Sequence, residues 1–164
     1  MKKIAYLSLG SNLGDREANL REAIGRLGEL GMVRAVSAFY ETEPVEVQGR
    51  QPWFLNAAAA VETELQPQEF LERMLAIEQS MGRTRTVPRG PRTIDLDILL
   101  FGDDVLDMPG LTVPHPAMQQ RRFVLTPLAE IAPDARHPML QRSVRELLDS
   151  LPEDAGSVSR FRSN

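Results

Sequence analysis

The stretch GPRTIDLDILLFG at residues 90–102 is the most informative part of the sequence, because its pattern predicts a strand in the middle of the chain. An apolar, β-branched run lies between Gly-Pro and Gly-Asp-Asp, as is typical of a strand bounded by turns. Side chains alternate between the two faces of a strand, so Asp95 and Asp97 are expected together on one face, about 7 Å apart. The apolar residues expected on the opposite face are Ile94, Leu96, Ile98 and Leu100.

The two aspartates form a candidate metal site. Adjacent carboxylates repel each other and resist burial, and a divalent cation, or a pair of cations, removes both costs. Ligands that are all oxygen favour Mg²⁺ over Zn²⁺. The alternative is an edge strand whose polar face is merely solvated, and the aspartates alone do not decide between the two.

A basic loop precedes this strand. Its four guanidinium groups lie within ten residues that contain no acid, at Arg83, Arg85, Arg89 and Arg92. Glycines and prolines within residues 82–91 favour a loop over a helix. Arginine forks match phosphate oxygens, although a run of like charge is usually just a solvated surface. Beside the paired aspartates, the loop predicts a site for Mg²⁺-nucleotide and phosphoryl transfer.

The composition bounds the class of protein. The chain has 164 residues and no Cys, so it can bury a core without disulfides, has no thiolate for a metal site or a nucleophile, and fits a reducing compartment. A formal charge of −4 argues against a nucleic-acid binder. The only lysines are Lys2 and Lys3, which excludes a Walker A loop.

The ends of the chain carry their own predictions. The apolar start, residues 1–9, is interpreted as a strand rather than a signal peptide, because no cleavage-like site follows it. No segment approaches the ~20 apolar residues that span a membrane. We therefore expect one cytoplasmic domain over residues 1–164, with a flexible tail at 155–164.

The order of the predicted elements favours an α+β fold. These elements are a strand at 3–10, a helix from about Asp15 to Gly31, strands at 32–42 and 53–64, a helix at 67–81 and the aspartate strand. The β-α-β-β-α-β order is typical of a ferredoxin-like sandwich. Residues 103–164 are expected to add short, proline-containing pieces and one helix near 143–150.

Glu78 is a carboxylate predicted on the inner face of the helix at 67–81. The apolar stripe of that face consists of Phe70, Leu71, Met74, Leu75, Ile77 and Met81. A carboxylate within the stripe needs a partner, because it gains nothing from the dipole near a helix C-terminus. That partner is either an arginine in a structural ion pair or a ligand edge rich in N–H groups.

Asn56, on the strand predicted at 53–64, is a candidate ligand-binding residue. Phe54, Ala58 and Ala60 share its face, and the small alanines leave space there. A flat heterocycle could stack on Phe54 while the donors and acceptor of Asn56 bond its edge. The alternative is that Asn56 satisfies a neighbouring backbone group.

Seven blocks of the chain resemble, in order, the motifs of the 6-hydroxymethyl-7,8-dihydropterin pyrophosphokinase family of folate biosynthesis. They are LGSNLG at 9–14, YETEP at 40–44, FLNAA at 54–58, IE at 77–78, GRTR at 82–85, GPRTIDLD at 90–97 and LTVPH at 111–115. The resemblance spans roughly residues 3–150.

The resemblance implies transfer of the terminal diphosphate of ATP to the hydroxymethyl oxygen of the dihydropterin, with release of AMP. By similarity, Asp95 and Asp97 would hold two Mg²⁺ ions. Arg83 and Arg92 would neutralise the charge on the transferred phosphoryl groups, and His115 would lie beside the triphosphate.

The resemblance also implies two binding sites. The positions that match the ATP site are Glu78, Arg83, Arg85, Arg92, Ile98, Thr112, His115 and Arg121. The positions that match the pterin site, whose ring would lie between the two phenylalanines, are Thr42, Val45, Phe54, Asn56 and Phe123. For Glu78, the resemblance leaves open which substrate it chiefly contacts.

The chain departs from the family in the basic loop. Many members have a Trp there, whereas this loop is shorter by one residue and has none. Arg89 is the candidate that replaces the Trp in a lid closing over bound ATP, because a guanidinium plane stacks on a heterocycle. Gly110 and Pro116 also differ from some members.

Two other functions share part of this pattern. An RNA-binding ferredoxin-like module shares the element order but needs exposed aromatics in a basic motif, which the sequence lacks. A Mg²⁺-dependent phosphatase or nucleotidyl transferase shares only the paired aspartates. The expected partners are ATP and the dihydropterin; we expect a monomer that binds neither nucleic acid nor membrane.

Overall fold

An antiparallel sheet runs through the protein and carries helices on both faces. The computed structural model describes residues 2–43, 53–82, 93–153 and 156–162. In the described residues, the strand order is β10-β3-β4-β1-β5, and β2 also pairs with β4. The long central strands are β1 (Lys3–Ser11), β4 (Phe54–Thr63) and β5 (Asp95–Phe101).

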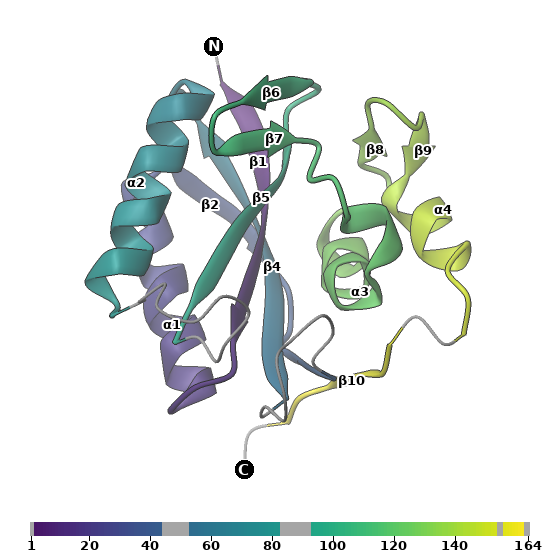
Figure 1. Cartoon of the computed structure of the whole chain (residues 1–164), viewed down its shortest axis with the longest axis horizontal. Helices are drawn as coiled ribbons and strands as arrows, with labels where there is room; N and C mark the ends of the chain where they lie inside the picture. Colours follow the sequence, from purple (N-terminus) through teal and green to yellow (C-terminus); the bar gives the residue numbers. More distant parts are fainter. Residues whose placement is uncertain (1, 44–52, 83–92, 154–155, 163–164) are drawn as a thin grey trace.

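The helices divide between the two faces of the sheet. Helices α1 (Arg16–Arg26) and α2 (Pro67–Ser80) lie on one side of it, whereas α3 (Arg122–Ile131) and α4 (Val144–Asp149) lie on the other (Figure 1). Short 3-10 turns follow α1 at Leu27–Glu29 and precede α3 at Met118–Gln120. Among the described residues, no helix is both long and apolar enough to cross a membrane.

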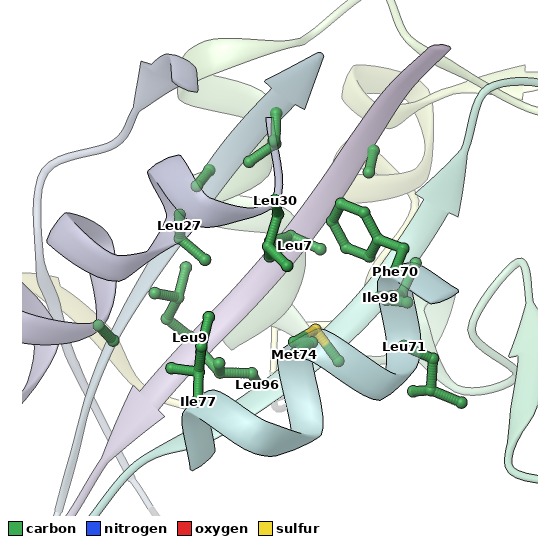
Figure 2. Packing of buried hydrophobic residues seen from close by; sticks show 14 of the residues in the cluster. Leu7, Leu9, Leu27, Leu30, Phe70, Leu71, Met74, Ile77, Leu96 and Ile98 are labelled. Atoms are coloured by element: carbon green, nitrogen blue, oxygen red, sulfur yellow. The ribbon is translucent and has the colours of Figure 1, made fainter. Parts of the chain in front are cut away.

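The larger core lies between the sheet and α1 and α2. Leu7 of β1 and Leu96 of β5 point toward Met74 of α2 (Figure 2). Phe70 meets Phe101 edge to face, with ring centroids 5.5 Å apart. Period-two side chains from the strands and period-3.6 side chains from the helix therefore close one apolar layer. This layer fixes α2 against β5, which positions the site described below.

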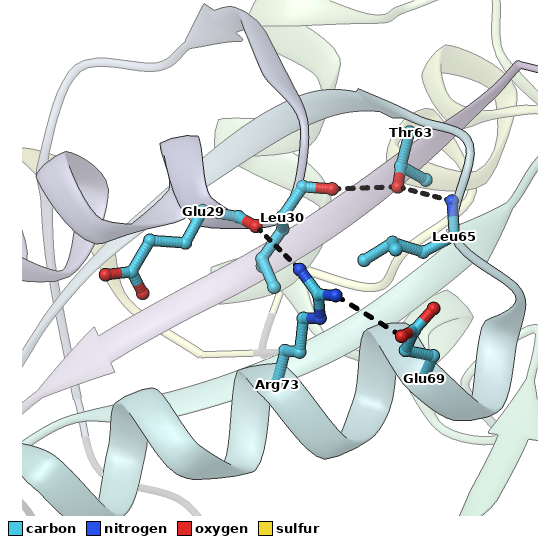
Figure 3. Close-up of polar contacts among 6 residues, drawn as sticks. All are labelled: Glu29, Leu30, Thr63, Leu65, Glu69 and Arg73. Atoms are coloured by element: carbon cyan, nitrogen blue, oxygen red, sulfur yellow. Dashed lines mark hydrogen bonds and ion pairs between the residues drawn. The ribbon is translucent and has the colours of Figure 1, made fainter.

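Polar contacts attach the start of α2 to the turn before β2 (Met32–Val36). The Thr63 hydroxyl donates to the carbonyl of Leu30 at 2.8 Å and accepts from the N–H of Leu65 at 3.1 Å (Figure 3). Arg73 pairs with Glu69 at 3.3 Å and also reaches the backbone at the end of the α1 region. The β4–α2 connection is therefore held at both of its ends.

Most of the elements expected before residue 103 are confirmed. The bounds of β1, β4 and α2 agree with the sequence within one residue at each end. Asp15 caps α1, because its carboxylate accepts from the N–H of Ala18 at 3.1 Å.

The single strand expected at 32–42 is wrong, because it is two strands, β2 and β3 (Tyr40–Thr42). Between them the N–H of Ala38 donates to the Glu130 carboxylate of α3 at 3.0 Å. The carbonyl of Phe39 accepts from the N–H of Phe161 at 2.8 Å. Side-chain and tail contacts thus replace the regular ladder at this point.

The expected face of Leu100 is also wrong. The β1–β5 register places Ile98 opposite Leu7 but Leu100 opposite Tyr6, so Leu99 is an extra residue in a β-bulge. Leu100 consequently packs with Leu99 under α3 rather than with Ile98 under α2.

The C-terminal part contains more structure than the sequence predicts. It adds the hairpins β6 (Leu106–Met108) with β7 (Leu111–Val113) and β8 (Arg136–His137) with β9 (Arg142–Ser143). Helix α3 was not expected because it contains Pro127. Within the tail expected to be flexible, β10 (Val158–Arg160) pairs with β3.

Candidate active site

One row of the sheet joins three strands on the face that α3 partly covers. Gly10 of β1 lies opposite Asn56 of β4 on one side and opposite Asp95 of β5 on the other. The next row joins Ala58, Ser8 and Asp97 in the same way. Because neighbouring strands lie ~4.8 Å apart, the backbones at Asn56 and Asp95 are about 10 Å apart.

The paired aspartates lie at the outer strand of this row. Both side chains belong to partly buried residues and point to the same face of β5, as the alternation predicts. β5 ends the strand order, so its outer edge pairs with no other strand in the described structure.

A pocket of about 380 Å³ runs along that outer edge of β5. Its walls come from α2, from β5 and from the segment that follows β6. Its lining residues are Leu71, Met74, Leu75, Glu78, Asp95, Leu96, Asp97, Ile98, Gly110, Leu111, Thr112, His115 and Pro116. The pocket therefore joins acidic, apolar and imidazole groups from three separate segments.

Glu78 projects from α2 onto β5. Its residue is 2% exposed, and one carboxylate oxygen accepts the N–H of Leu96 at 2.7 Å. The inward placement of Glu78 is thus confirmed. One partner is a backbone N–H, which is neither of the partners considered from the sequence.

His115 is held at the far wall of the pocket. Its Nδ1 accepts the N–H of Ala117 at 3.2 Å, and its own backbone N–H donates to the carbonyl of Leu99. Burial, reinforced by the charge of Arg121, lowers the His115 pKa, while Asp95 opposes the shift. A neutral imidazole whose Nδ1 accepts carries its proton on Nε2, so His115 can donate one hydrogen bond to an anion.

A second cluster of polar side chains lies at the β4 end of the row. The side-chain amide of Asn56 donates to the Thr42 hydroxyl, and these residues are 3% and 1% exposed. A Cβ added to Gly10 would lie 2.7 Å from Asn56 Oδ1 and 3.4 Å from the Phe54 ring. Gly10 therefore leaves the space that the side chains of Asn56 and Phe54 use.

Arg121 and Phe123 lie at the start of α3. The Arg121 guanidinium carbon is 5.6 Å from the centroid of the Phe123 ring, which is a cation–π distance. Neither residue lines the pocket along β5. Arg121 is nevertheless close enough to His115 to lower its pKa, so the start of α3 lies near the His115 wall of the pocket.

The donor set of the site fits magnesium. No group of three or more His, Cys, Asp or Glu that could hold a metal occurs in the described part of the chain. Mg²⁺ is commonly bound by one or two carboxylates together with substrate phosphates and water. Asp95 and Asp97 supply such a pair of carboxylates, so the described residues fit Mg²⁺ that binds together with a polyphosphate.

The structure brings together six of the residues predicted from the sequence in the β5 pocket: Glu78, Asp95, Asp97, Ile98, Thr112 and His115. It groups Thr42, Phe54 and Asn56 at the other end of the row. Arg121 and Phe123 lie together at the start of α3. The other predicted residues, Val45, Arg83, Arg85, Arg89 and Arg92, lie outside the described residues.

Sequence reasoning missed two features of the site. Leu75, expected in the core, is 37% exposed and lines the pocket with Leu71 and Leu111. Gly10 was predicted only as the last residue of the strand at 3–10, although it separates Asn56 from Asp95. A glycine inside a strand often marks a close approach, and that signal could have identified Gly10.

Comparisons with known proteins show which family this chain resembles. A sequence model of the 7,8-dihydro-6-hydroxymethylpterin-pyrophosphokinase (HPPK) family matches residues 6–133. A Bacillus subtilis protein named 2-amino-4-hydroxy-6-hydroxymethyldihydropteridine pyrophosphokinase is 51% identical over 133 residues, which cover 80% of this chain and 79% of that protein. A Pseudomonas aeruginosa protein of the same name is 47% identical over 150 residues, which cover 90% and 91%.

In some longer relatives the match with this chain covers only part of their length. The Schizosaccharomyces pombe folic acid synthesis protein fol1 is 45% identical over 92% of this chain, but the match spans only 21% of that protein. An HPPK-DHPS crystal structure in complex with substrates matches 92% of this chain and 43% of its own, with a TM-score of 0.71 and 18% identity. Plasmodium falciparum HPPK-DHPS matches 91% and 44%, with a TM-score of 0.74. At such identity these structures show the fold alone.

Proposed function

The chain belongs to the 7,8-dihydro-6-hydroxymethylpterin-pyrophosphokinase family, and we propose that it transfers the terminal diphosphate of ATP to 6-hydroxymethyl-7,8-dihydropterin. AMP and the pterin diphosphate are the products. The observation that carries the proposal is the row Asn56–Gly10–Asp95, which links an amide-lined site to a carboxylate-lined pocket on one face of the sheet.

The pterin binds at the β4 end of the row. Phe54 stacks on one face of its ring, and Phe123 of α3 covers the other. Asn56, held by Thr42, bonds the amino-pyrimidinone edge, because an amide supplies both donor and acceptor. Val45 completes this pocket by family resemblance. The hydroxymethyl arm of the pterin then points along the row toward Asp95.

ATP binds along the outer edge of β5. The apolar wall from α2 and β7 takes the base, and Thr112 and Ile98 contact the nucleoside. His115 donates from Nε2 to a phosphate oxygen, since its Nδ1 is occupied by the N–H of Ala117. Arg121 adds positive charge on the side that faces the pterin.

The reaction is a displacement at the β-phosphorus of ATP. The hydroxymethyl oxygen forms a bond to that phosphorus, and the bond from it to the oxygen bridging to the α-phosphorus breaks. AMP leaves with the bridging oxygen, and the hydroxyl proton passes to solvent. Catalysis of this kind rests on positioning and on electrostatic stabilisation.

Asp95 and Asp97 would hold Mg²⁺, for which we propose two ions, and when bound the metal would supply charge neutralisation to the phosphates. By family resemblance, Arg83 and Arg92 would neutralise charge on the β- and γ-phosphoryl oxygens, and Arg85 would contact the nucleotide. Each well-placed arginine would contribute about 3–4 kcal/mol to the transition state, by analogy with oxyanion donors. Arg89 closes the loop over the bound nucleotide.

Product analysis tests the proposed function. The protein is incubated with Mg-ATP and the hydroxymethyl-dihydropterin, and the nucleotides are separated. AMP and pterin diphosphate, formed in equal amounts, are expected. ADP would instead indicate a phosphatase or a simple kinase, and an adenylated product would indicate a nucleotidyl transferase. Asp103→Ala, at an exposed acid outside the site, is a control that should keep full activity.

We further propose a ferredoxin-like sandwich, because β5-β1-β4 followed by β2 and β3 is the strand order that a β-α-β-β-α-β chain forms by split β-α-β packing. The chain is proposed to act as one cytoplasmic domain and as a monomer, without nucleic acid. The absence of Cys is consistent with a reducing compartment.

A further inference from the structure

The segment that carries both aspartates lies at an edge of the sheet. β5 pairs with β1 through its inner edge, and it ends the strand order on the other side. Leu96 stands between Asp95 and Asp97 in the chain, and its side chain is buried at 3% exposure in the core under α2. Any movement of the Leu96 backbone therefore moves both carboxylates.

At the outer edge of β5, a side chain from α2 accepts a backbone hydrogen bond that a neighbouring strand would otherwise accept. Glu78 accepts the Leu96 N–H at 2.7 Å, the short distance typical of a hydrogen bond to a charged acceptor. The N–H is buried, so leaving it without an acceptor is costly. The bond thus joins a packed helix to the one residue that separates the two aspartates.

We propose that Glu78 is a positioning residue for the transfer reaction: by holding the Leu96 N–H, it fixes β5 and so sets the direction of Asp95 and Asp97. This inference rests on the proposed function, since it assigns the aspartates to the metal. It differs from the role that the resemblance implies, in which Glu78 contacts a substrate.

Two observations favour positioning over direct contact. Glu78 is 2% exposed, and the oxygen that accepts from Leu96 is directed at the main chain. Within the described residues, Glu78 does not form a group of three with the two aspartates that could hold a metal. Its carboxylate acts on the strand that bears the ligands rather than as one of them.

Two substitutions separate these roles. Glu78→Gln keeps an oxygen that can accept the Leu96 N–H but removes the charge. Glu78→Met keeps the length and the helix propensity but removes the acceptor. Glu72→Met makes the same change at an exposed position of α2 and serves as the matched control.

Hydrogen exchange of the Leu96 amide in the ligand-free protein reports the bond itself. Exchange is expected to be slow in the wild type, in Glu78→Gln and in Glu72→Met, and faster in Glu78→Met. Slow exchange in Glu78→Met, or loss of protection in Glu78→Gln, would overturn the proposal. Because this readout needs neither metal nor substrate, it stands apart from catalysis.

Kinetics report the consequence of losing the bond. Misplacement of reacting groups by 1 Å costs about 10²-fold in rate, so kcat of Glu78→Met should fall about 10²-fold, and the Mg²⁺ concentration for half-maximal rate should rise. The pterin KM should stay unchanged. Glu78→Gln should keep kcat within about threefold, since a neutral acceptor still makes the bond.

The opposite pattern would overturn the proposal. If Glu78 bonds a substrate, Glu78→Gln should raise the KM of that substrate as much as Glu78→Met does, with no change in the Mg²⁺ requirement. If Glu78→Met fails to fold in a thermal melt, Glu78→Gln still decides between the two. A wild type that makes no pterin diphosphate would refute the proposed function, whereas an active wild type with an active Glu78→Met variant would refute only the role of Glu78.

Discussion

The two ends of the active-site row differ in how the fold holds them. Asn56 lies on an interior strand, between Gly10 of β1 and Tyr40 of β3, and its amide is bonded to Thr42 within the protein. Asp95 and Asp97 lie on the last strand of the sheet, partly exposed, and α2 holds its outer edge through Glu78. We call these the β4 half and the β5 half of the site.

This difference indicates that the β4 half serves substrate binding and the β5 half serves the chemical step. The β4 half consists of uncharged groups that the sheet orders before any ligand arrives, which lowers the entropic cost of binding a rigid ring. The β5 half concentrates like charges, which repel each other and which a cation bound together with a polyphosphate would balance. Changes in the β4 half should therefore affect affinity, and changes in the β5 half should affect turnover.

The largest effect is expected in the β5 half. Asp95→Ala or Asp97→Ala should lower kcat about 10³-fold, because several kcal/mol of charge stabilisation at the phosphates is lost with the metal. Calorimetric titration should show the pterin affinity changed by less than about threefold. The melting temperature should stay equal or rise, because one member of a repelling pair is gone.

Asp103→Ala is the control for this prediction, because it removes an exposed carboxylate just after β5. If either active-site variant kept near wild-type kcat at saturating Mg²⁺, the chemistry would not depend on the β5 half. If the variants lost pterin binding as strongly as turnover, the two halves would not be separable.

The next effect belongs to the β4 half. Gly10→Ala adds a Cβ 2.7 Å from Asn56 Oδ1, so the amide must turn away and its ligand bonds are lost. Pterin affinity should fall about 10- to 100-fold, which corresponds to one to two bonds of about 1.4 kcal/mol. At saturating pterin, kcat should change little.

Gly25→Ala is the matched control. A Cβ at Gly25 meets no atom within 4 Å, and alanine favours the helix at that position of α1. This variant should be slightly more stable and bind pterin normally. Unchanged pterin affinity in Gly10→Ala would mean that Asn56 does not read the ligand.

The sequence alone predicted where the carboxylates of the β5 half lie. Alternation on β5 placed Asp95 and Asp97 together, and the helical stripe of α2 placed Glu78 inward, because each signal arises from the period of one element. Both predictions are confirmed by the structure. The Leu96 N–H, one partner of Glu78, could not be predicted, because the sequence pattern does not show which backbone N–H group lies near a side chain.

Features that depend on two or more segments were the ones missed. The bulge that turns Leu100 to the α3 face depends on the β1–β5 register. The break between β2 and β3 depends on Glu130, which is distant in sequence. Local propensity also gave a wrong prediction for α3. Pro127 disfavours a helix in the sequence, but the packing of Leu125 and Leu128 stabilises the helix in the structure.

A smaller effect tests the internal bond of the β4 half. Thr42→Val removes the hydroxyl that accepts from the Asn56 amide. The buried N–H then lacks this acceptor, so the free energy of unfolding should fall by about 1–2 kcal/mol and pterin affinity by several-fold. Thr42→Ser keeps the hydroxyl and should restore both. Denaturant unfolding and calorimetry measure the two effects, and a Val variant with wild-type affinity would show that Asn56 needs no support.

The smallest expected effect is a pH dependence of the free energy of unfolding, to which only the β5 half contributes a titrating histidine. Thr42, Phe54 and Asn56 do not titrate, whereas burial lowers the pKa of His115 in the β5 half and of His137 in the β8–β9 hairpin. Below about pH 6.5 the unfolded chain takes up protons that the folded histidines resist. The free energy of unfolding should therefore be highest above that pH and decline as pH falls toward the lowered pKa values.

Asparagine variants assign this decline to each histidine. Asn Oδ1 can accept the same N–H that His Nδ1 accepts, from Ala117 in one case and from Met139 and Leu140 in the other. Asn cannot take up a proton, so His115→Asn and His137→Asn should each make the dependence of unfolding free energy on pH shallower below about pH 6.5. Denaturant melts of ligand-free protein across this range measure it. Unchanged slopes in both variants would mean that carboxylates alone cause the acid destabilisation, and the β5 half would then be no more sensitive to pH than the β4 half.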